Sequence, residues 1–370
     1  METPVFNEDL VITFAEGVVG LWNLRSGEQF EIYEQRFVER IYELYETLAV
    51  EYQYQSEDSV LLQAGVLLQG DEAERYHVEK AKGPWGWDLL SKIFHFGTKH
   101  KGVGETSERD KGYTASGYLD YCESIYSSAP DIEIERLGRK YELPRYSTGS
   151  LSKNSLEEAL LNRITSRNFI EEPIHTNLIS DVLYMTFGKV HGDRRKEEFS
   201  ERGIITVGYR RSSPSAGCLQ ATEAYLIANR IDGIPRGVYH YQPGDHSLTH
   251  INELNDYPMD KALCYQEFAL QAAFLIVLTS RFDKLWWKYP HSRAYRSGLM
   301  DIGHLSQTYY LVAGAYGLNT WCTGYFIDDM LNELVNADGF KEHALFILAG
   351  GPGTFDPLNP SIEGAITKHP

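Results

Sequence analysis

Phe274-Leu-Ile-Val-Leu278 is the apolar run on which the fold prediction for this chain is based. A run of this length and composition predicts a buried strand, and Ala344-Leu-Phe-Ile-Leu-Ala349 predicts a second one. Between them, the apolar pattern from Tyr295 to Tyr316 predicts the longest helix, which ends at Gly317. Helices interleave with hydrophobic strands without regular βαβ alternation. The sequence therefore predicts an α+β fold, in which a sheet is flanked by helices.

Two helices are predicted upstream of these strands. Ser155 and Glu158 form a capping box, and Leu156, Leu160 and Leu161 are expected to be the buried stripe of the first helix. The second helix is expected to begin at Thr176 as N-cap and to end at Gly188.

Further strands, a hairpin and more helices complete the prediction. Residues 224–228 and 320–325 read as strands, residues 237–241 and 246–251 as a hairpin, and residues 258–270 and 328–336 as helices. The histidines of the hairpin do not suggest a metal site, because four strand residues separate His246 from His250 by about 13 Å. We therefore predict a solvent-facing hairpin and no bound metal.

Composition excludes several classes of protein. The chain has 370 residues, a net charge of −17 and 42% hydrophobic residues, which suits a large core and not a nucleic-acid-binding surface. No apolar run of 18 or more residues and no signal-peptide pattern is present, so we expect no membrane segment. The four cysteines are far apart and without CxxC spacing, which is typical of reduced thiols in a cytoplasmic protein.

The pattern also divides the chain into segments. Residues 1–85 read as a small α/β module, with strand-like pieces at Leu10–Phe14 and Val60–Leu62 and a helix from Gln35 to Val50. Residues 86–150 read as a polar connecting arm with one or two short helices. Residues 151–370 form the main domain.

Tyr209-Arg-Arg-Ser-Ser-Pro-Ser-Ala-Gly217 is a small, polar loop ahead of an apolar run. Its small residues leave backbone amides sterically accessible, which suits close approach to a flat or anionic ligand. An ordinary turn joining two elements is the alternative.

Lys288-Tyr289 places an ammonium beside a phenol, a pair suited to proton transfer. A neighbouring ammonium lowers the pKa of a phenol by favouring phenolate, and burial lowers the pKa of a lysine. The alternative is a surface lysine beside a packing tyrosine.

Arg163-Ile-Thr-Ser-Arg167-Asn-Phe169 carries two guanidiniums four residues apart with hydroxyls between them. Such donors suit a phosphate. The equal alternative is that these arginines stabilise the dipole at the end of a helix.

In their order along the chain these motifs resemble the nitroreductase-like flavoproteins, specifically the SagB-type azoline dehydrogenases. The resemblance covers about residues 150–357. Its motifs are residues 163–169, 210–217, 237–248, 288–289, 295–307, 317–318 and 323–326. Ile164 and Thr165 stand where the family usually has Arg and Ser, and Cys218 and Gln220 replace commoner residues. No Lys or Arg that would help to bind phosphate stands directly after Gly353.

The resemblance implies a central mixed or antiparallel sheet and a homodimer with flavin mononucleotide (FMN) at the subunit interface. It implies oxidation of a thiazoline or oxazoline to a thiazole or oxazole, in a ribosomal peptide or a substrate tethered to a carrier protein. A partner from a biosynthetic complex is a further expectation. Lys288 and Tyr289 would be the catalytic pair, with either as the base. The residues implied in FMN binding are Arg163, Thr165 and Arg167 at the phosphate, Pro214, Ser215 and Gly217 along the ring, and Gln307 and Gly324 as further contacts.

Two other functions remain open at this point. One is a flavin nitro- or quinone reductase that uses NAD(P)H, which would not need the Lys288-Tyr289 base. The other is an inactive flavin-binding scaffold of a biosynthetic complex. Residues 1–85 are expected either to recognise a peptide or partner or to assist dimer packing.

Overall fold

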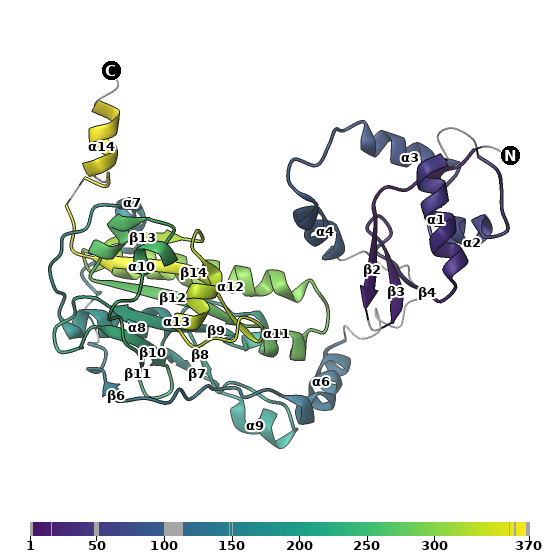
Figure 1. Cartoon of the computed structure of the whole chain (residues 1–370). Coiled ribbons are helices and arrows are strands. Elements are labelled where there is room, and N and C mark those ends of the chain that lie inside the picture. Colours follow the sequence, from purple (N-terminus) through teal and green to yellow (C-terminus); the bar gives the residue numbers. More distant parts are fainter. Residues whose placement is uncertain are drawn as a thin grey trace. The chain divides into compact units, whose positions relative to one another are not determined.

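The computed structural model of the chain describes residues 3–15, 17–47, 52–99, 114–147, 149, 151–354, 356–358 and 360–367. The chain divides into two compact units, Met1–Ser107 and Glu108–Pro370 (Figure 1). Among the described residues, no helix is both long enough and apolar enough to cross a membrane.

The first unit is built on a three-stranded antiparallel sheet in the order β2-β3-β4. Ile41 and Leu44 of α1 are buried against Leu21 of this sheet and Leu61 of α2. Val60–Leu62, predicted as a strand, lies in α2, and the predicted end of α1 at Val50 lies outside the described residues. The elements are β1 Val5–Phe6, β2 Leu10–Ala15, β3 Val18–Asn23, β4 Gln29–Ile32, α1 Gln35–Thr47, α2 Asp58–Gln63, β5 Leu67–Leu68, α3 Asp71–Lys80 and α4 Leu89–Gly97.

The second unit contains a seven-stranded sheet in the order β13-β14-β12-β9-β10-β11-β6. Every neighbouring pair in it is antiparallel, which confirms the predicted α+β class. The strands are β6 Lys140–Glu142, β9 Thr222–Ala228, β10 Gly237–Gln242, β11 Ser247–Asn252, β12 Phe274–Arg281, β13 Asn319–Thr323 and β14 Glu342–Gly351, and a separate pair consists of β7 His191–Gly192 and β8 Tyr209–Arg210.

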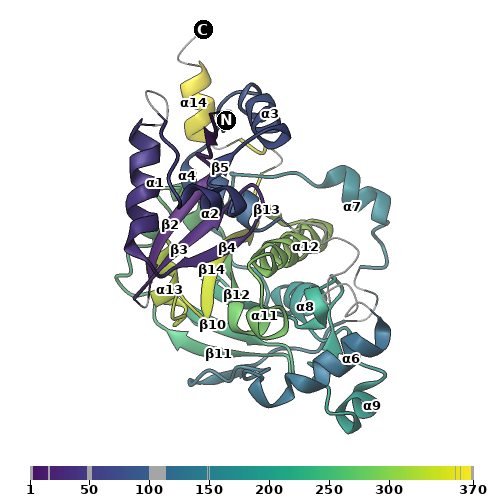
Figure 2. The same cartoon turned by 90° about the vertical axis from the view of Figure 1, so that its right-hand side faces the viewer.

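Helices cover both faces of the large sheet (Figure 2). Alternate strand residues, such as Leu226 and Ile276, pack against α8 and α12, whereas Ile227 and Leu275 pack against α10 and α13. The helical elements are α6 Ala115–Ser124, η1 Tyr126–Ser128, α7 Leu156–Asn162, α8 Thr176–Phe187, α9 Lys196–Glu201, η2 Ala216–Cys218, α10 Met259–Ala262, η3 Glu267–Gln271, α11 Phe282–Lys288, α12 Ala294–Ala315, α13 Asp328–Leu334 and α14 Pro360–Thr367.

The predicted ends of the helices agree in part with the structure. The capping box of Ser155 and Glu158 is present, and Gly188 ends α8, but His175 and not Thr176 is the N-cap of α8. The predicted helix at residues 258–270 is two short pieces, α10 and η3.

Two predictions about burial are wrong. Leu156, Leu160 and Leu161 of α7 are exposed. The prediction failed because an amphipathic pattern does not show whether another layer covers the apolar face. The hairpin of β10 and β11 does not face solvent: its strands lie inside the large sheet, and Tyr239 and Leu248 are fully buried.

Candidate active site

Arg211 anchors the predicted ligand loop to the core. Its guanidinium is buried and donates to the carbonyl oxygens of Phe187 (2.9 Å) and Thr222 (2.8 Å), which joins the loop to α8 and β9. The hydroxyl of Ser212 adds a bond of 2.6 Å to the carbonyl of Met185. The loop therefore starts from a rigid base.

Asp301 of α12 holds the next part of the loop. Its carboxylate accepts hydrogen bonds from the hydroxyl of Ser215 (2.9 Å) and from the backbone N–H of Ala216 (3.0 Å). Burial raises the pKa of Asp301, while these two donors act in the opposite direction. The Ala216 amide is therefore paired within the chain, contrary to the expectation of accessible amides along this loop. Sequence reasoning missed Asp301, whose one signal was an acidic residue inside the apolar pattern of α12.

Lys288 and Gly217 meet, although 71 residues separate them. Lys288 Nζ donates to the carbonyl oxygen of Gly217 over 3.1 Å. Gly217 has φ +56°, and a Cβ atom there would lie 3.1 Å from Cζ of Tyr289 and 3.2 Å from Cδ of Lys288. Only glycine suits this position, because a side chain would be strained and would collide with the Lys288-Tyr289 pair.

The electrostatic setting of this pair differs from the expectation for the phenol. Burial raises the pKa of Tyr289, with a hydrogen bond to Tyr118 acting the other way, so the phenol is not shifted towards phenolate. Burial also lowers the pKa of Lys288, against Coulombic effects of Cys122 and Cys218. Within the pair, the amine is therefore the better candidate for the base.

Helix α6 contributes side chains that the sequence did not single out. The hydroxyl of Tyr121 donates to the carbonyl of Lys288 (3.0 Å), and Lys288 Nζ lies 5.7 Å from the centre of the Tyr118 ring. A cavity of about 180 Å³ lies beside Lys288 and Gly217 and is lined mainly by apolar side chains, among them Ile132, Phe199, Ile204 and Val207. The amine therefore borders a small, largely apolar space.

The predicted phosphate residues lie on the other side of α12. Arg163 Nη1 is 3.4 Å from the hydroxyl of Thr165, which lies 3.4 Å from the hydroxyl of Tyr310. Arg163 and Arg167 are both exposed. Nine residues at about 100° each place Tyr310 opposite Asp301 around the helix. The structure thus brings Arg163 and Thr165 together, apart from the loop at Gly217.

Three further residues predicted to contact the cofactor are exposed. Gln307 is exposed on α12, one turn before Tyr310, and Pro214 is exposed beside Ser213, whose hydroxyl bonds that of Thr308 at 2.6 Å. Gly324 is exposed just after β13, where a Cβ atom would contact only Phe346, at 3.7 Å or more. Gln307 therefore lies between Asp301 and Tyr310 along α12.

A buried charge cluster underlies α11. Glu223 of β9 lies 3.2 Å from Nε2 of His240 and 3.7 Å from Nζ of Lys284, which is one helical turn before Lys288. Burial opposes ionisation of Glu223, but the bond from His240 and the charges of Lys284 and Arg211 lower its pKa to about 2. The pKa of Lys284 is also lowered, because burial and the charges of Arg281 and Arg211 outweigh the attraction of Glu223 and Asp283. Among the described residues, no three His, Cys, Asp or Glu side chains are grouped to hold a metal ion.

Comparisons with known proteins agree with this fold. The chain is 28% identical over 197 residues to the nitroreductase-family protein MJ1384 of Methanocaldococcus jannaschii, covering 53% of this chain and 90% of that protein. It is 29% identical over 135 residues to the microcin B17-processing protein McbC of Escherichia coli, covering 35% of this chain and 49% of McbC.

A solved structure supports the same assignment at the level of the fold. A nitroreductase-family protein from Anabaena variabilis matches with a TM-score of 0.51 and 20% identity, over 74% of this chain and 49% of that one. The Nitroreductase family itself matches residues 160–351, more than half of the 370 residues. The chain therefore belongs to the Nitroreductase family.

Proposed function

We propose that this protein is an FMN-dependent oxidase that dehydrogenates a thiazoline or oxazoline ring in a peptide to the thiazole or oxazole. The observation that carries the proposal is the position of Lys288. Its amine, with a pKa lowered by burial, is fixed at the Gly217 loop and borders the apolar cavity of about 180 Å³. An amine in such a place is suited to accept a proton from a carbon atom.

The donors at Arg163 fit the phosphate of FMN. A phosphate dianion takes charge-assisted bonds from guanidinium groups and neutral bonds from hydroxyls. Arg163 and Arg167 offer the first and Thr165 and Tyr310 the second. Pro214, Ser215 and Gly217 would then lie along the flavin ring, with Gln307 and Gly324 as further contacts. When bound, FMN supplies the two-electron oxidant, which accepts a hydride and is regenerated by dioxygen.

Aromatisation of an azoline breaks one C–H bond on each of two neighbouring ring carbons and forms a C=C bond. One hydrogen leaves as a proton and the other as a hydride. Neutral Lys288 accepts the proton, while its bond to the Gly217 carbonyl fixes the nitrogen. Tyr289 stays protonated, since burial raises its pKa, and it acts as a hydrogen-bond donor and not as the base.

The relatives support a peptide substrate. McbC is a microcin B17-processing protein, and the matching segment spans about half of it. We propose that this chain likewise acts on a peptide, either ribosomal or tethered to a carrier protein, as a homodimer in a cytoplasmic biosynthetic complex. The exposed leucines of α7 support a further interface, the four free cysteines suit a reducing compartment, and residues 1–85 would recognise the peptide or a partner.

A second candidate is an FMN-dependent nitro- or quinone reductase that draws electrons from NAD(P)H. The match to 90% of MJ1384 favours it, because that segment extends over nearly a whole nitroreductase-family protein. Such an enzyme would not need the amine of Lys288 as a base.

One anaerobic experiment separates these functions. The FMN-loaded protein is mixed with a thiazoline peptide in the absence of NAD(P)H, and flavin absorbance and peptide mass are followed. Bleaching of the flavin together with loss of two hydrogens from the peptide is the expected result. Bleaching by NAD(P)H but not by the peptide would support the reductase. A protein that binds no FMN would overturn both proposals.

A further inference from the structure

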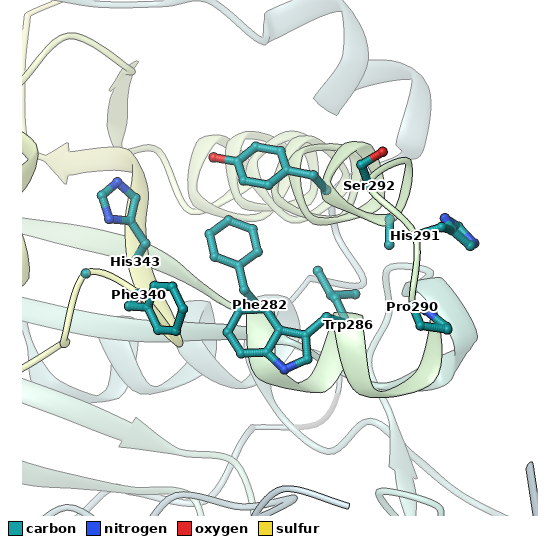
Figure 3. Close-up of a pocket in the computed structure, with 11 residues that line it drawn as sticks. Phe282, Trp286, Pro290, His291, Ser292, Phe340 and His343 are labelled. Atoms are coloured by element: carbon teal, nitrogen blue, oxygen red, sulfur yellow. The ribbon is translucent and has the colours of Figure 1, made fainter. Parts of the chain in front are cut away.

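A second and larger cavity is lined in part by the residues that directly follow Tyr289. It has a volume of about 550 Å³ and is lined by residues of α11, of the start of α12 and of the turn before β14 (Figure 3). Leu285 and Phe282 are buried at its wall. Its volume falls in the range of small-molecule sites.

Two aromatic pairs shape this cavity. Phe282 and Tyr295 stack with ring centres 4.6 Å apart and planes 18° apart. Trp286 and Phe340 form the other pair at 5.5 Å, and these two rings lie close together in Figure 3. Trp286 and Phe340 are exposed although both are large and apolar, with Phe340 71% accessible. Faces of this kind are suited to a planar ring.

The lining also excludes charged ligands. Of the residues that the structure describes, those that line the cavity include no Lys, Arg, Asp or Glu. The imidazole of His343 is fixed by Asn332 at Nδ1 (2.9 Å) and by Asp328 at Nε2 (3.2 Å), so both of its nitrogens are already engaged. A phosphate or carboxylate would give up its hydration without gaining an ion pair to one of the described lining residues that is Lys or Arg. A neutral ring carries no charge and does not incur this cost.

Some residues that line this cavity directly follow the Lys288-Tyr289 pair in the sequence. Pro290 and His291 line it directly after Tyr289, and the backbone N–H of His291 donates to the carbonyl of Tyr289 over 2.7 Å. His291 is three residues after Lys288, and three residues of extended chain span at most about 11 Å. The backbone at His291 therefore lies no farther than this from the backbone at Lys288. A peptide whose ring lies at Lys288 could therefore place a group one to three residues away in this cavity.

We propose that the cavity binds a neutral planar ring of the peptide substrate, one to three residues from the azoline that is oxidised. This inference rests on the proposed function, because the azoline at Lys288 fixes the position of the chain. The ring has two sources with the same chemistry: an aromatic side chain, or an azole already formed in the same peptide. The enzyme would then select its site of oxidation by a neighbouring ring.

Binding of unreactive peptides tests the cavity without turnover. Three probes carry a thiazole at the central position, with phenylalanine, a second thiazole or alanine two residues away. Each is titrated by calorimetry against the FMN-loaded wild type and Phe340→Ala. Ring-bearing probes are expected to bind the wild type roughly three- to tenfold more tightly than the alanine probe, and Phe340→Ala should remove most of that difference. The alanine probe should bind both proteins equally.

The outcomes are distinguishable from those of the oxidase test. Equal binding of all three probes to the wild type, or an equal loss for all three in Phe340→Ala, would overturn the cavity proposal even if azolines are oxidised. The expected pattern without any oxidation of thiazoline peptides would instead refute the oxidase and leave a ring-binding site. Trp286→Leu is the second variant, and unchanged melting temperatures confirm that both variants are folded.

Discussion

Lys288 Nζ donates a hydrogen bond to the carbonyl oxygen of Gly217 over 3.1 Å, which joins the end of α11 to the loop before β9. Burial lowers the pKa of this lysine. The bond places a partly desolvated amine at the loop that we propose to lie along the flavin. Each side of this contact can be tested separately.

The first prediction concerns the pH dependence of the proposed base. Lys288 accepts a proton only when neutral, so the rate of flavin reduction by an azoline peptide should rise with pH and level off above the lysine's lowered pKa. Lys288→Met should lose about 10²- to 10⁴-fold in this rate and retain bound FMN. Stopped-flow absorbance over a pH series measures both. An unchanged pH profile in Lys288→Met would show that another group is the base.

The second prediction concerns Gly217. Gly217→Ala should destabilise the fold by about 1–2 kcal/mol through the positive φ, and by about 1–3 kcal/mol more through contact with Tyr289. It should also impair flavin reduction. Gly203→Ala is the matched control, because Gly203 has φ +75° with nothing within 4 Å of a Cβ atom. Urea unfolding and turnover are compared, and equal effects of the two substitutions would contradict the proposed contact.

The third prediction concerns the phosphate residues. Arg163→Ala should weaken FMN binding by roughly ten- to a hundredfold, the effect of one charge-assisted hydrogen bond. It should leave binding of riboflavin, which has no phosphate, unchanged. Arg195→Ala is the control, since Arg195 is an exposed arginine paired with Glu198. Fluorescence titration of both flavins measures this. A parallel loss of riboflavin affinity would place Arg163 elsewhere in the site.

The fourth prediction concerns Asp301. Asp301→Ala would leave the half-buried Ser215 hydroxyl and Ala216 amide without their acceptor, at a cost of up to about 1–3 kcal/mol for each group. Asp301→Asn keeps one acceptor oxygen and should cost less. FMN affinity and thermal unfolding should both follow the order wild type, Asn, Ala. If Asp301→Ala bound FMN as tightly as the wild type, the contacts of Asp301 with the loop would not contribute to flavin binding.

The fifth prediction concerns the buried charges beneath α11. Glu223→Gln leaves Lys284 without its carboxylate and should cost about 3–5 kcal/mol, whereas Lys284→Met leaves Glu223 with His240 and should cost less. The folded pKa of Glu223, about 2, lies below its unfolded value, so its stabilisation is present above about pH 4.3 and is lost as the pH falls towards 2. Urea unfolding should therefore show the gap between wild type and Glu223→Gln narrowing below about pH 4. A gap that does not depend on pH would refute this account.

Several parts of the candidate site could be predicted from the chain alone. Lys288, Tyr289 and Gly217 stand in short motifs, and the structure brings these three residues together. Asp301 and Tyr118 were not found, because their roles depend on contacts with residues 85 or more positions away. The expected phenolate was wrong for a related reason: burial by segments distant in the sequence raises the pKa of Tyr289.

Helices and strands whose signals are local could be predicted from the residues alone. The capping box of α7, the long helix α12 and the buried strands β12 and β14 follow from residue periodicity and capping within a few positions. Three features depend on contacts between distant segments: the interior position of the β10–β11 hairpin, the exposure of the α7 leucines, and the hydrogen bond from Lys288 to Gly217. Burial and pKa depend on which distant segments exclude water from a group, and no local pattern records that.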